Sequence, residues 1–266
     1  MTSYLQAAIA RTRAQVAKSK SAWSESDLDE AIREAGDARR FFQALVERRG
    51  DSPFRIVGGI RLCDAAHGTD FEPLAMARRY QRAGASALAL VEGETDDPFA
   101  ARNAIAAIRS AVPLPLLHHR LVIDPHQIRE SRAWGADAVL LVAEALTEGE
   151  VIDYQILASE LAMTSVLLAH EEWNLLRTIR HVGFPHASGC LIAIDNRDPS
   201  TGDVDLTRSV RLAGLVEDRK ILLSLHGIRE SKDVATLRKC GFHLAMVSSE
   251  DGGDPVETTR LLLQGD

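Results

Sequence analysis

The chain has 266 residues, and its 31 lysine and arginine residues against 38 aspartate and glutamate residues give a formal net charge of −7. An apolar fraction of 45% and a charged fraction of 26% are typical of a globular protein and exclude the disordered and fibrous classes. The acidic balance offers no electrostatic surface for nucleic acid, and no apolar stretch approaches the roughly 20 residues that span a bilayer, so we expect neither a nucleic-acid nor a membrane partner.

The first fifty residues are predicted to be helical. Apolar and small side chains recur there at helical spacing, at Leu5, Ala8, Ile9, Thr12 and Val16. Ser26 and Asp29 form a pattern like a capping box that starts a second helix, and Gly36 is placed to end it. Because these helices precede the first strand, we expect residues 1–50 to be an N-terminal helical extension of a single domain covering 1–266.

From Pro53 onward, short apolar runs alternate with amphipathic helical segments, as in repeated βα units. The eight predicted strands are 55–60, 87–91, 114–117, 138–142, 165–169, 191–194, 221–223 and 244–247. They are short and apolar, like parallel strands buried on both faces. Glycines that end helices precede three of them, at Gly84, Gly135 and Gly241, and Asp124-Pro125 is a helix start signal.

Eight such units predict a closed (β/α)8 barrel, the TIM barrel, with the N-terminal helical extension in front of it. An open doubly wound sheet is the alternative fold. The absence of a G-x-G-x-x-G pattern after the first strand weakens that alternative.

The active site of a (β/α)8 barrel lies at the C-terminal ends of the strands, so polar residues that follow each apolar run are the candidates. In chain order they are Arg61, Asp64, Glu92, His118, His119, Arg120, Glu144, His170, Glu171, Asp195, Asn196, Arg197, Ser224, His226, Ser248 and Ser249. For any one of them, a solvated loop or helix-capping role is about as common as a functional role.

Two clusters are notable within this set. The loops after the seventh and eighth strands carry His226-Gly227, Ser248-Ser249 and Gly252-Gly253, at the place where such barrels often bind phosphate on backbone N–H groups. Ordinary turn formation accounts for the same residues equally well.

The second cluster consists of His119, His170 and His226, on alternate strands, with Asp195 between them. Three imidazoles and a carboxylate at one mouth are a zinc-type ligand set. No H-x-H or H-E-x-x-H spacing supports it, so we do not expect a metal.

The distribution of lysine excludes several reaction classes. The five lysines are Lys18, Lys20, Lys220, Lys232 and Lys239. None lies between Lys20 and Lys220, which removes the strand lysine that a Schiff-base aldolase or a pyridoxal enzyme needs. There is also no P-loop and no Gly-x-Ser-x-Gly turn, so we expect no cofactor.

Cysteine usage predicts a reduced, cytoplasmic protein. Cys63, Cys190 and Cys240 are too few and too widely spaced for a disulfide framework or a metal knot. The first apolar segment is interrupted by Arg11 and Arg13, which argues against a secretory signal. No pattern predicts an oligomeric state.

Residues 123–128 and 134–142 resemble the segment from the third to the fourth strand of the indole-3-glycerol phosphate synthase family, the barrel enzymes of tryptophan biosynthesis. Further similar segments are 75–85, 193–198 and 204–206, and the resemblance covers essentially the whole chain from Leu5. It implies the barrel fold with an N-terminal helical extension. It also implies closure of an indole ring on carboxyphenylamino-deoxyribulose phosphate, with loss of carbon dioxide and then water.

The family's reaction uses one lysine as general acid, a second lysine that holds the substrate, and two glutamates for proton transfer. The resemblance implies that Arg61 and His119 replace the two lysines and that Gly59 and Leu168 replace two glutamates. By the same resemblance, Asp195 replaces the family's Asn, Leu225-His226 replaces its Glu-Ser on the seventh strand, and Ser248 replaces a glycine. Asn196, Arg197 and Gly227 are unchanged.

Three functional hypotheses follow. The first is a paralogue in which the ring-closing decarboxylase activity is lost or strongly impaired and which binds a phosphorylated small molecule through Arg197, Asn196, Gly227, Ser248 and Ser249. The second is a repurposed barrel enzyme that uses His119, His226 and Asp195, with or without a metal, and the third is a divergent working synthase. The candidate catalytic residues are His119, Arg61, Asp195 and His226.

Overall fold

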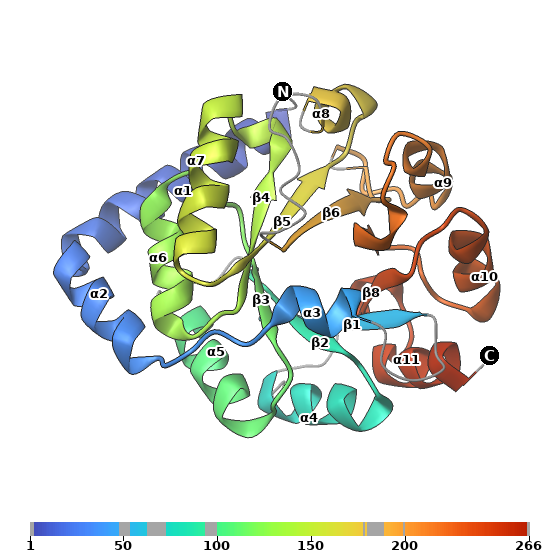
Figure 1. The fold of residues 1–266 in the computed structure, drawn as a ribbon, viewed down its shortest axis with the longest axis horizontal. Helices are drawn as coiled ribbons and strands as arrows, with labels where there is room; N and C mark the ends of the chain where they lie inside the picture. The colour runs from blue at the N-terminus through green and yellow to red at the C-terminus, as the bar shows by residue number, and fades with distance from the viewer. Residues whose placement is uncertain are drawn as a thin grey trace.

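A computed structural model describes residues 3–47, 54–62, 73–93, 100–177, 179, 189–198 and 200–264. Its parallel strands close into a barrel in chain order, because β1 pairs with both β2 and β8 (Figure 1). The strands are β1 (Arg55–Arg61), β2 (Ala87–Val91), β3 (Leu116–His119), β4 (Ala138–Val142), β5 (Thr164–Ala169), β6 (Cys190–Asp195), β7 (Leu222–Leu225) and β8 (Leu244–Ser248). The predicted (β/α)8 barrel is confirmed, and the open-sheet alternative is wrong.

Helices surround the barrel and precede it (Figure 1). Those before β1 are α1 (Ser3–Ala22), α2 (Glu25–Glu34) and α3 (Phe41–Val46). Those that follow are α4 (Pro73–Ala83), α5 (Ala100–Ala111), α6 (Pro125–Trp134), α7 (Glu148–Glu160), α8 (Glu172–Arg177), α9 (Thr207–Ala213), α10 (Ser231–Lys239) and α11 (Pro255–Gln264). Within the described ranges, none of these helices is both long enough and apolar enough to cross a membrane.

Helix α2 lies against α6 on the outside of the barrel, and the buried face of α1 includes the predicted Ile9, Thr12 and Val16. The start of the second helix differs from the prediction. Ser24, not Ser26, is its N-cap, and it forms a reciprocal capping box with Asp27. Both serines have an aspartate three residues later, so the sequence pattern alone did not distinguish them.

The local stop and start signals of the βα units are confirmed. Gly36, Gly84, Gly135 and Gly241 all have positive φ angles, the conformation that glycine adopts at least cost at a helix end. The side chain of Asp124 accepts a hydrogen bond from the backbone N–H of His126, with Pro125 in the first helical turn. These signals are local, which is why they were readable in the sequence.

The prediction for the third strand is wrong by two residues. The prediction was 114–117, whereas β3 runs from Leu116 to His119, because Pro115 has no N–H to donate to a neighbouring strand. His118 and His119 therefore lie within the strand and point to opposite sides of it. His118 faces the helix layer, where its Nδ1 is 2.9 Å from Oγ of Ser131 on α6, so His119 faces the barrel interior.

The floor of the barrel, at the N-terminal ends of β3 and β4, is fixed by a buried carboxylate. Asp137 is fully buried and accepts hydrogen bonds from the backbone N–H groups of Arg39 and Leu116, at 2.7 and 2.8 Å. Nη1 of Arg109 lies 2.8 Å from the same carboxylate. We call Asp137, Arg39, Leu116 and Arg109 the floor cluster, and it ties the segment between α2 and α3 to the barrel.

Candidate functional site

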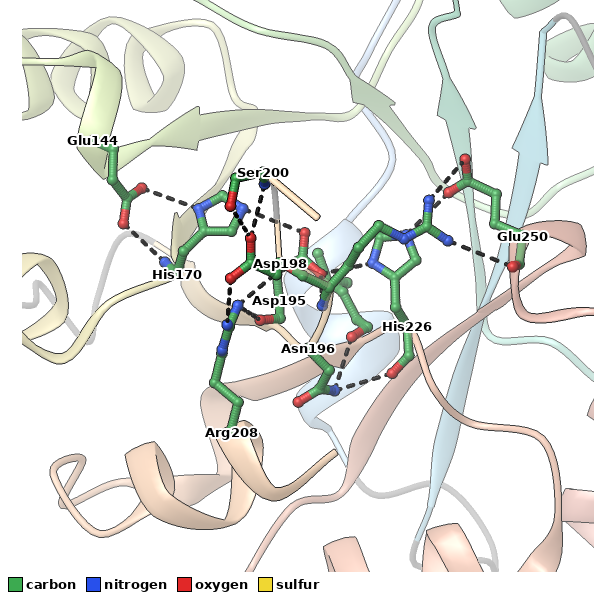
Figure 2. A network of polar contacts seen from close by, with 11 residues as sticks. Glu144, His170, Asp195, Asn196, Asp198, Ser200, Arg208, His226 and Glu250 are labelled. Carbon is green, nitrogen blue, oxygen red and sulfur yellow. Dashed lines mark hydrogen bonds and ion pairs between the residues drawn. The ribbon is translucent and has the colours of Figure 1, made fainter. Parts of the chain in front are cut away.

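The mouth of the barrel, at the C-terminal strand ends, holds a row of alternating acidic and basic side chains, which we call the mouth network (Figure 2). Its members are Glu144, His170, Asp195, His226, Glu250, Arg61 and Arg197. Asp195, the last residue of β6, lies between two imidazoles. Its Oδ1 is 2.7 Å from Nδ1 of His226, and its Oδ2 is 3.4 Å from Nε2 of His170.

Carboxylates lie on the outer sides of both imidazoles. Oε2 of Glu144 is 3.3 Å from Nδ1 of His170, and Oε2 of Glu250 is 3.0 Å from Nε2 of His226. All four ring nitrogens of the two histidines therefore face carboxylate oxygens. Within the part of the chain that the structure describes, no group of three or more His, Cys, Asp or Glu side chains is arranged to hold a metal ion.

The two arginines of the mouth network meet at Glu250. Its Oε1 forms an ion pair with the guanidinium of Arg61, at the end of β1, and lies 3.5 Å from Nη1 of Arg197. The backbone N–H of Arg197 also donates to Oδ1 of Asp195 at 2.8 Å. The network thus joins the ends of β4, β5, β6, β7, β8 and β1.

The carboxylates of the network keep both of its imidazoles protonated. Burial lowers the pKa of His170, but hydrogen bonds to Asp195 and Glu144 outweigh burial and raise that pKa to about 9. The same balance applies to His226. Burial lowers its pKa, but hydrogen bonds to Asp195 and Glu250 outweigh burial and raise that pKa to about 9. At neutral pH both rings carry a positive charge.

The carboxylates in turn stay ionised. Burial raises the pKa of Asp195, yet hydrogen bonds from His170 and His226 hold it far below its usual range. The hydrogen bond from His226 and the charge of Arg197 lower the pKa of Glu250 to about 2 despite burial. The mouth network is a fully charged, internally paired array.

His119 differs from the other two histidines of the mouth. Its Nε2 atom is buried and has no hydrogen-bond partner among the described residues. Burial, reinforced by the positive charge of His226, lowers the pKa of His119 to about 4. The mouth therefore contains one neutral imidazole with an unused ring nitrogen beside two imidazolium groups.

The loops after β7 and β8, where phosphate was expected, are occupied by two carboxylates of the chain itself. Glu250 and Asp251 lie in the short 3-10 helix η5 (Ser249–Asp251), which follows β8 directly. The backbone N–H of Gly227 donates to Oδ1 of Asp251 at 2.6 Å, and a backbone hydrogen bond from Ser248 reaches the same carboxylate. Neither residue is among the candidates predicted from the sequence, although an acidic pair close to a strand end is a readable signal.

Asn196, one of the predicted ligand-binding residues, joins the loops through its hydrogen bonds. Its side chain is fully buried, and its amide NH2 group lies 2.9 Å from Oγ of Ser224, 2.8 Å from the carbonyl oxygen of Leu225 and 3.0 Å from that of His226. Its Oδ1 accepts the backbone N–H of Ser209 at 3.0 Å. Asn196 thus positions Arg197 on one side and His226 on the other.

Of the remaining predicted site residues, the structure brings His119, Arg61, Asp195, His226 and Arg197 to one mouth. Ser248 ends β8 with a buried Oγ that has no partner among the described residues, and Ser249 begins η5. Asp64 and Cys63 lie outside the described residues. A cavity of about 720 Å³ opens beside Arg61, lined also by residues of α1.

The closed barrel of parallel strands, with charged side chains at the C-terminal strand ends, defines the chain as a (β/α)8 barrel protein. The family model described as indole-3-glycerol phosphate synthase matches residues 5–250. The chain belongs to the indole-3-glycerol phosphate synthase family.

Curated relatives agree with the family match. The chain is 32% identical over 240 residues to indole-3-glycerol phosphate synthase 2 of Ralstonia nicotianae, covering 89% of this chain and 87% of that one. It is 31% identical over 252 residues to indole-3-glycerol phosphate synthase of Neisseria gonorrhoeae, covering 93% of both. Among solved structures, N-acetylmannosamine-6-phosphate 2-epimerase from Clostridium perfringens has a TM-score of 0.54 at 13% identity, covering 74% and 86% of the two chains, a likeness of fold alone.

At three positions the resemblance implies a glutamate in the family. In this chain, one of these positions has no room for a larger side chain, and the other two carry apolar side chains. Gly59 pairs with Ser248 across β1 and β8, and a Cβ added at Gly59 would lie 2.8 Å from Cβ of Ser248. Leu168 and Leu225 are buried apolar residues at the ends of β5 and β7. None of these three positions can carry a proton.

Proposed function

We propose that this chain is a member of its family in which ring-closing decarboxylation is lost or strongly impaired, and that it binds a small phosphorylated molecule at the barrel mouth. One observation carries the proposal. Every protonated imidazole of the mouth is hydrogen-bonded on both ring nitrogens, and the only imidazole with an unused ring nitrogen in the described part of the mouth, His119, is neutral.

A general acid must hold a proton that it can release to the substrate at the working pH. His119, with its pKa lowered to about 4, holds no such proton near neutral pH. His170 and His226 hold protons, but carboxylates already accept them. Arg61 supplies a guanidinium, a group that binds anions rather than transferring protons. Since general acid or base catalysis contributes typically 10²- to 10⁴-fold, the loss of such groups predicts a severe loss of rate.

Other features of the mouth support binding. The cavity of about 720 Å³ is within the usual size of a small-molecule site. Arg61 and Arg197 both reach Glu250 at the mouth and supply cationic donors suited to phosphate or carboxylate. Unpartnered buried polar atoms also gather here, on Arg61, His119, Arg197 and Ser248, all within the described residues. Unsatisfied groups of this kind favour a polar ligand or water at the site.

A second candidate function rests on His119 alone. A neutral imidazole with an unused Nε2 is suited to act as a general base rather than an acid. With Asp195 and His226 beside it, the mouth would serve a repurposed enzyme that removes a proton from another small phosphorylated or carboxylated substrate.

We also propose a cytoplasmic location. Cys190 and Cys240 are free thiols, and burial raises the pKa of Cys190 to about 12, so that thiol is inert rather than redox-active. Fractionation of cells expressing the tagged chain tests this location, and recovery of the chain outside the cytoplasm would contradict it.

The decisive experiment incubates the purified chain, at high concentration, with carboxyphenylamino-deoxyribulose phosphate and follows indole fluorescence, with and without EDTA. The Ralstonia nicotianae relative, assayed in parallel, is the positive control. We expect no product from this chain and a higher thermal unfolding temperature when the substrate is added. Product formation would overturn the proposed loss of activity, and the absence of any thermal shift would overturn the proposed binding.

A further inference from the structure

The 3-10 helix η5 places two acidic side chains among the donors that an anion at the mouth would use. Asp251 accepts backbone N–H groups from Gly227, after β7, and from Ser248, at the end of β8. Glu250 faces the cations Arg61 and His226 and, with them, Arg197. Backbone N–H groups from the loops after strands 7 and 8 are the donors that hold phosphate in many barrels of this class.

We propose that Glu250 and Asp251 are an internal anion that occupies the phosphate position of the mouth, so that a phosphorylated ligand binds only by displacing them. The inference rests on the ligand class in the proposed function but does not depend on the loss of catalysis. It assigns to η5 a competing role at the site and makes these two residues determinants of ligand affinity.

The environment of Asp251 shows that its carboxyl group is held there at a cost. The residue is 3% exposed, and burial raises its pKa despite the hydrogen bond from Gly227. Its Oδ2 is buried and has no partner among the described residues. A buried carboxyl group with one unsatisfied oxygen is a poor structural anchor. In this proposal, the Asp251 carboxyl group is replaceable. The N–H groups that donate to it stay oriented to bind another anion.

The segment after η5 has steric room to change its conformation. Gly252 and Gly253 follow Asp251 with φ angles of +85° and +75°, and a Cβ added to either would meet nothing within 4 Å. Two adjacent glycines in open space allow large backbone rotations at little steric cost. Rotation at this pair, together with rotation at Ser249, where η5 joins β8, would withdraw both carboxylates from the donors.

A carboxylate tethered to the site by a short segment has a high effective concentration, on the order of millimolar or more. It therefore lowers the affinity of the mouth for any external anion that needs the same donors. Inorganic phosphate, which has no other part to bind with, is affected most. A larger ligand can offset the competition through contacts in the adjoining cavity.

The test is isothermal titration calorimetry with inorganic phosphate on the wild-type chain, Glu250→Gln, Asp251→Asn and the double variant. The matched control is Glu257→Gln, whose carboxylate lies on the exposed surface of α11 in an ion pair with Arg260. We expect each mouth variant to bind phosphate at least about tenfold more tightly than the wild type, since a like charge has been removed from the site. The control is expected to bind as the wild type does. Equal affinity in the wild type and the mouth variants would overturn the inference.

Because either variant could fold poorly, a second measurement uses only the wild type. Phosphate is titrated to saturation while backbone amide resonances are followed by NMR. Displacement predicts that the amides of Glu250 and Asp251 shift together with those of Gly227 and Ser248. Saturation without change at Glu250 and Asp251 would overturn the inference. Neither readout depends on indole formation, so product in the fluorescence assay would contradict the proposed function and leave this inference standing.

Discussion

Two buried carboxylates at opposite ends of the barrel, Asp137 at the floor and Asp195 at the mouth, are neutralised by different chemistry. Asp137 is held by two backbone N–H groups and by the guanidinium of Arg109. Asp195 is held by the imidazoles of His170 and His226, which do titrate. The positive charge that balances the buried carboxylate at the mouth therefore depends on pH through two histidines, whereas the floor cluster contains no histidine.

The two ends also differ in backbone conformation. At the floor, the left-handed residue is Gly135, for which a φ of +103° costs little. At the mouth, His226 has a φ of +61° although it is not a glycine, and this is a conformation that costs on the order of 1–3 kcal/mol in a non-glycine residue. The floor is arranged for stability, whereas the mouth keeps strain in order to aim His226 at Asp195 and Glu250.

The largest expected effect is at the floor. Asp137→Ala removes, from a buried site, the acceptor of the Arg39 and Leu116 N–H groups and the only carboxylate that pairs with Arg109 among the described residues, so we expect the free energy of unfolding to fall by about 3–5 kcal/mol. Urea denaturation measures it. The matched control is Asp29→Ala, which breaks an exposed ion pair with Arg129 and is expected to cost less than about 1 kcal/mol. Equal losses in the two variants would contradict the role given to the floor cluster.

The mouth is expected to make stability depend on pH. An imidazole whose pKa is about 6.5 when unfolded and about 9 when folded contributes on the order of 3 kcal/mol below pH 6.5, and this contribution disappears as the pH rises through 9. His170 faces Glu144 and Asp195, and His226 faces Asp195, Glu250 and the opposing charge of Arg197.

Urea denaturation at pH 6.5 and pH 9 measures this change, and we expect the wild type to be less stable at pH 9. The control is Asp195→Asn, which removes the carboxylate shared by both rings and should flatten the dependence. A wild-type stability that is constant from pH 6.5 to 9 would refute the charged state assigned to the mouth network.

At acid pH, Glu250 affects stability in the opposite direction. Its ion pairs contribute stability above its unfolded pKa of about 4.3, and this contribution is lost as the pH falls through about 2.

A smaller effect is expected from restoring an acid at Gly59. Gly59→Glu forces a side chain against Ser248 on β8, and overpacking of this kind costs about 1–3 kcal/mol. Thermal unfolding measures the loss. Ser248→Gly in the same chain is expected to recover most of it, because the opposing Cβ is then absent. Failure of the second substitution to recover stability would show that the two positions do not share one space.

The smallest effect on stability is expected at His119. His119→Gln removes a neutral ring that is unpartnered at Nε2 within the described residues, so the free energy of unfolding should change by less than about 1 kcal/mol. The informative measurement is an NMR titration of the wild-type ring resonances. We expect His119 to titrate near pH 4 and His170 and His226 near pH 9. A His119 that titrates near 6.5 would restore it as a candidate general acid.

Much of the fold could be predicted from the sequence because its signals are local. Strand-length apolar runs, glycines that end helices at Gly84, Gly135 and Gly241, and the Asp124-Pro125 helix start all act within a few residues. The errors had local causes as well. Because of Pro115, β3 begins two residues later than predicted. Two equivalent serine–aspartate patterns left the first residue of α2 ambiguous in the sequence.

The sequence by itself determined the barrel and the family, and it places all five lysines outside residues 21–219. Only the tertiary structure decided what the remaining polar residues do, because closure of the barrel brings β1 beside β8. That closure pairs Arg61 with Glu250, 189 residues away, and sets Gly59 opposite Ser248. Helix and strand periods extend over only a few residues, so they do not encode such long-range contacts. The charges and protonation states of the mouth follow from these contacts.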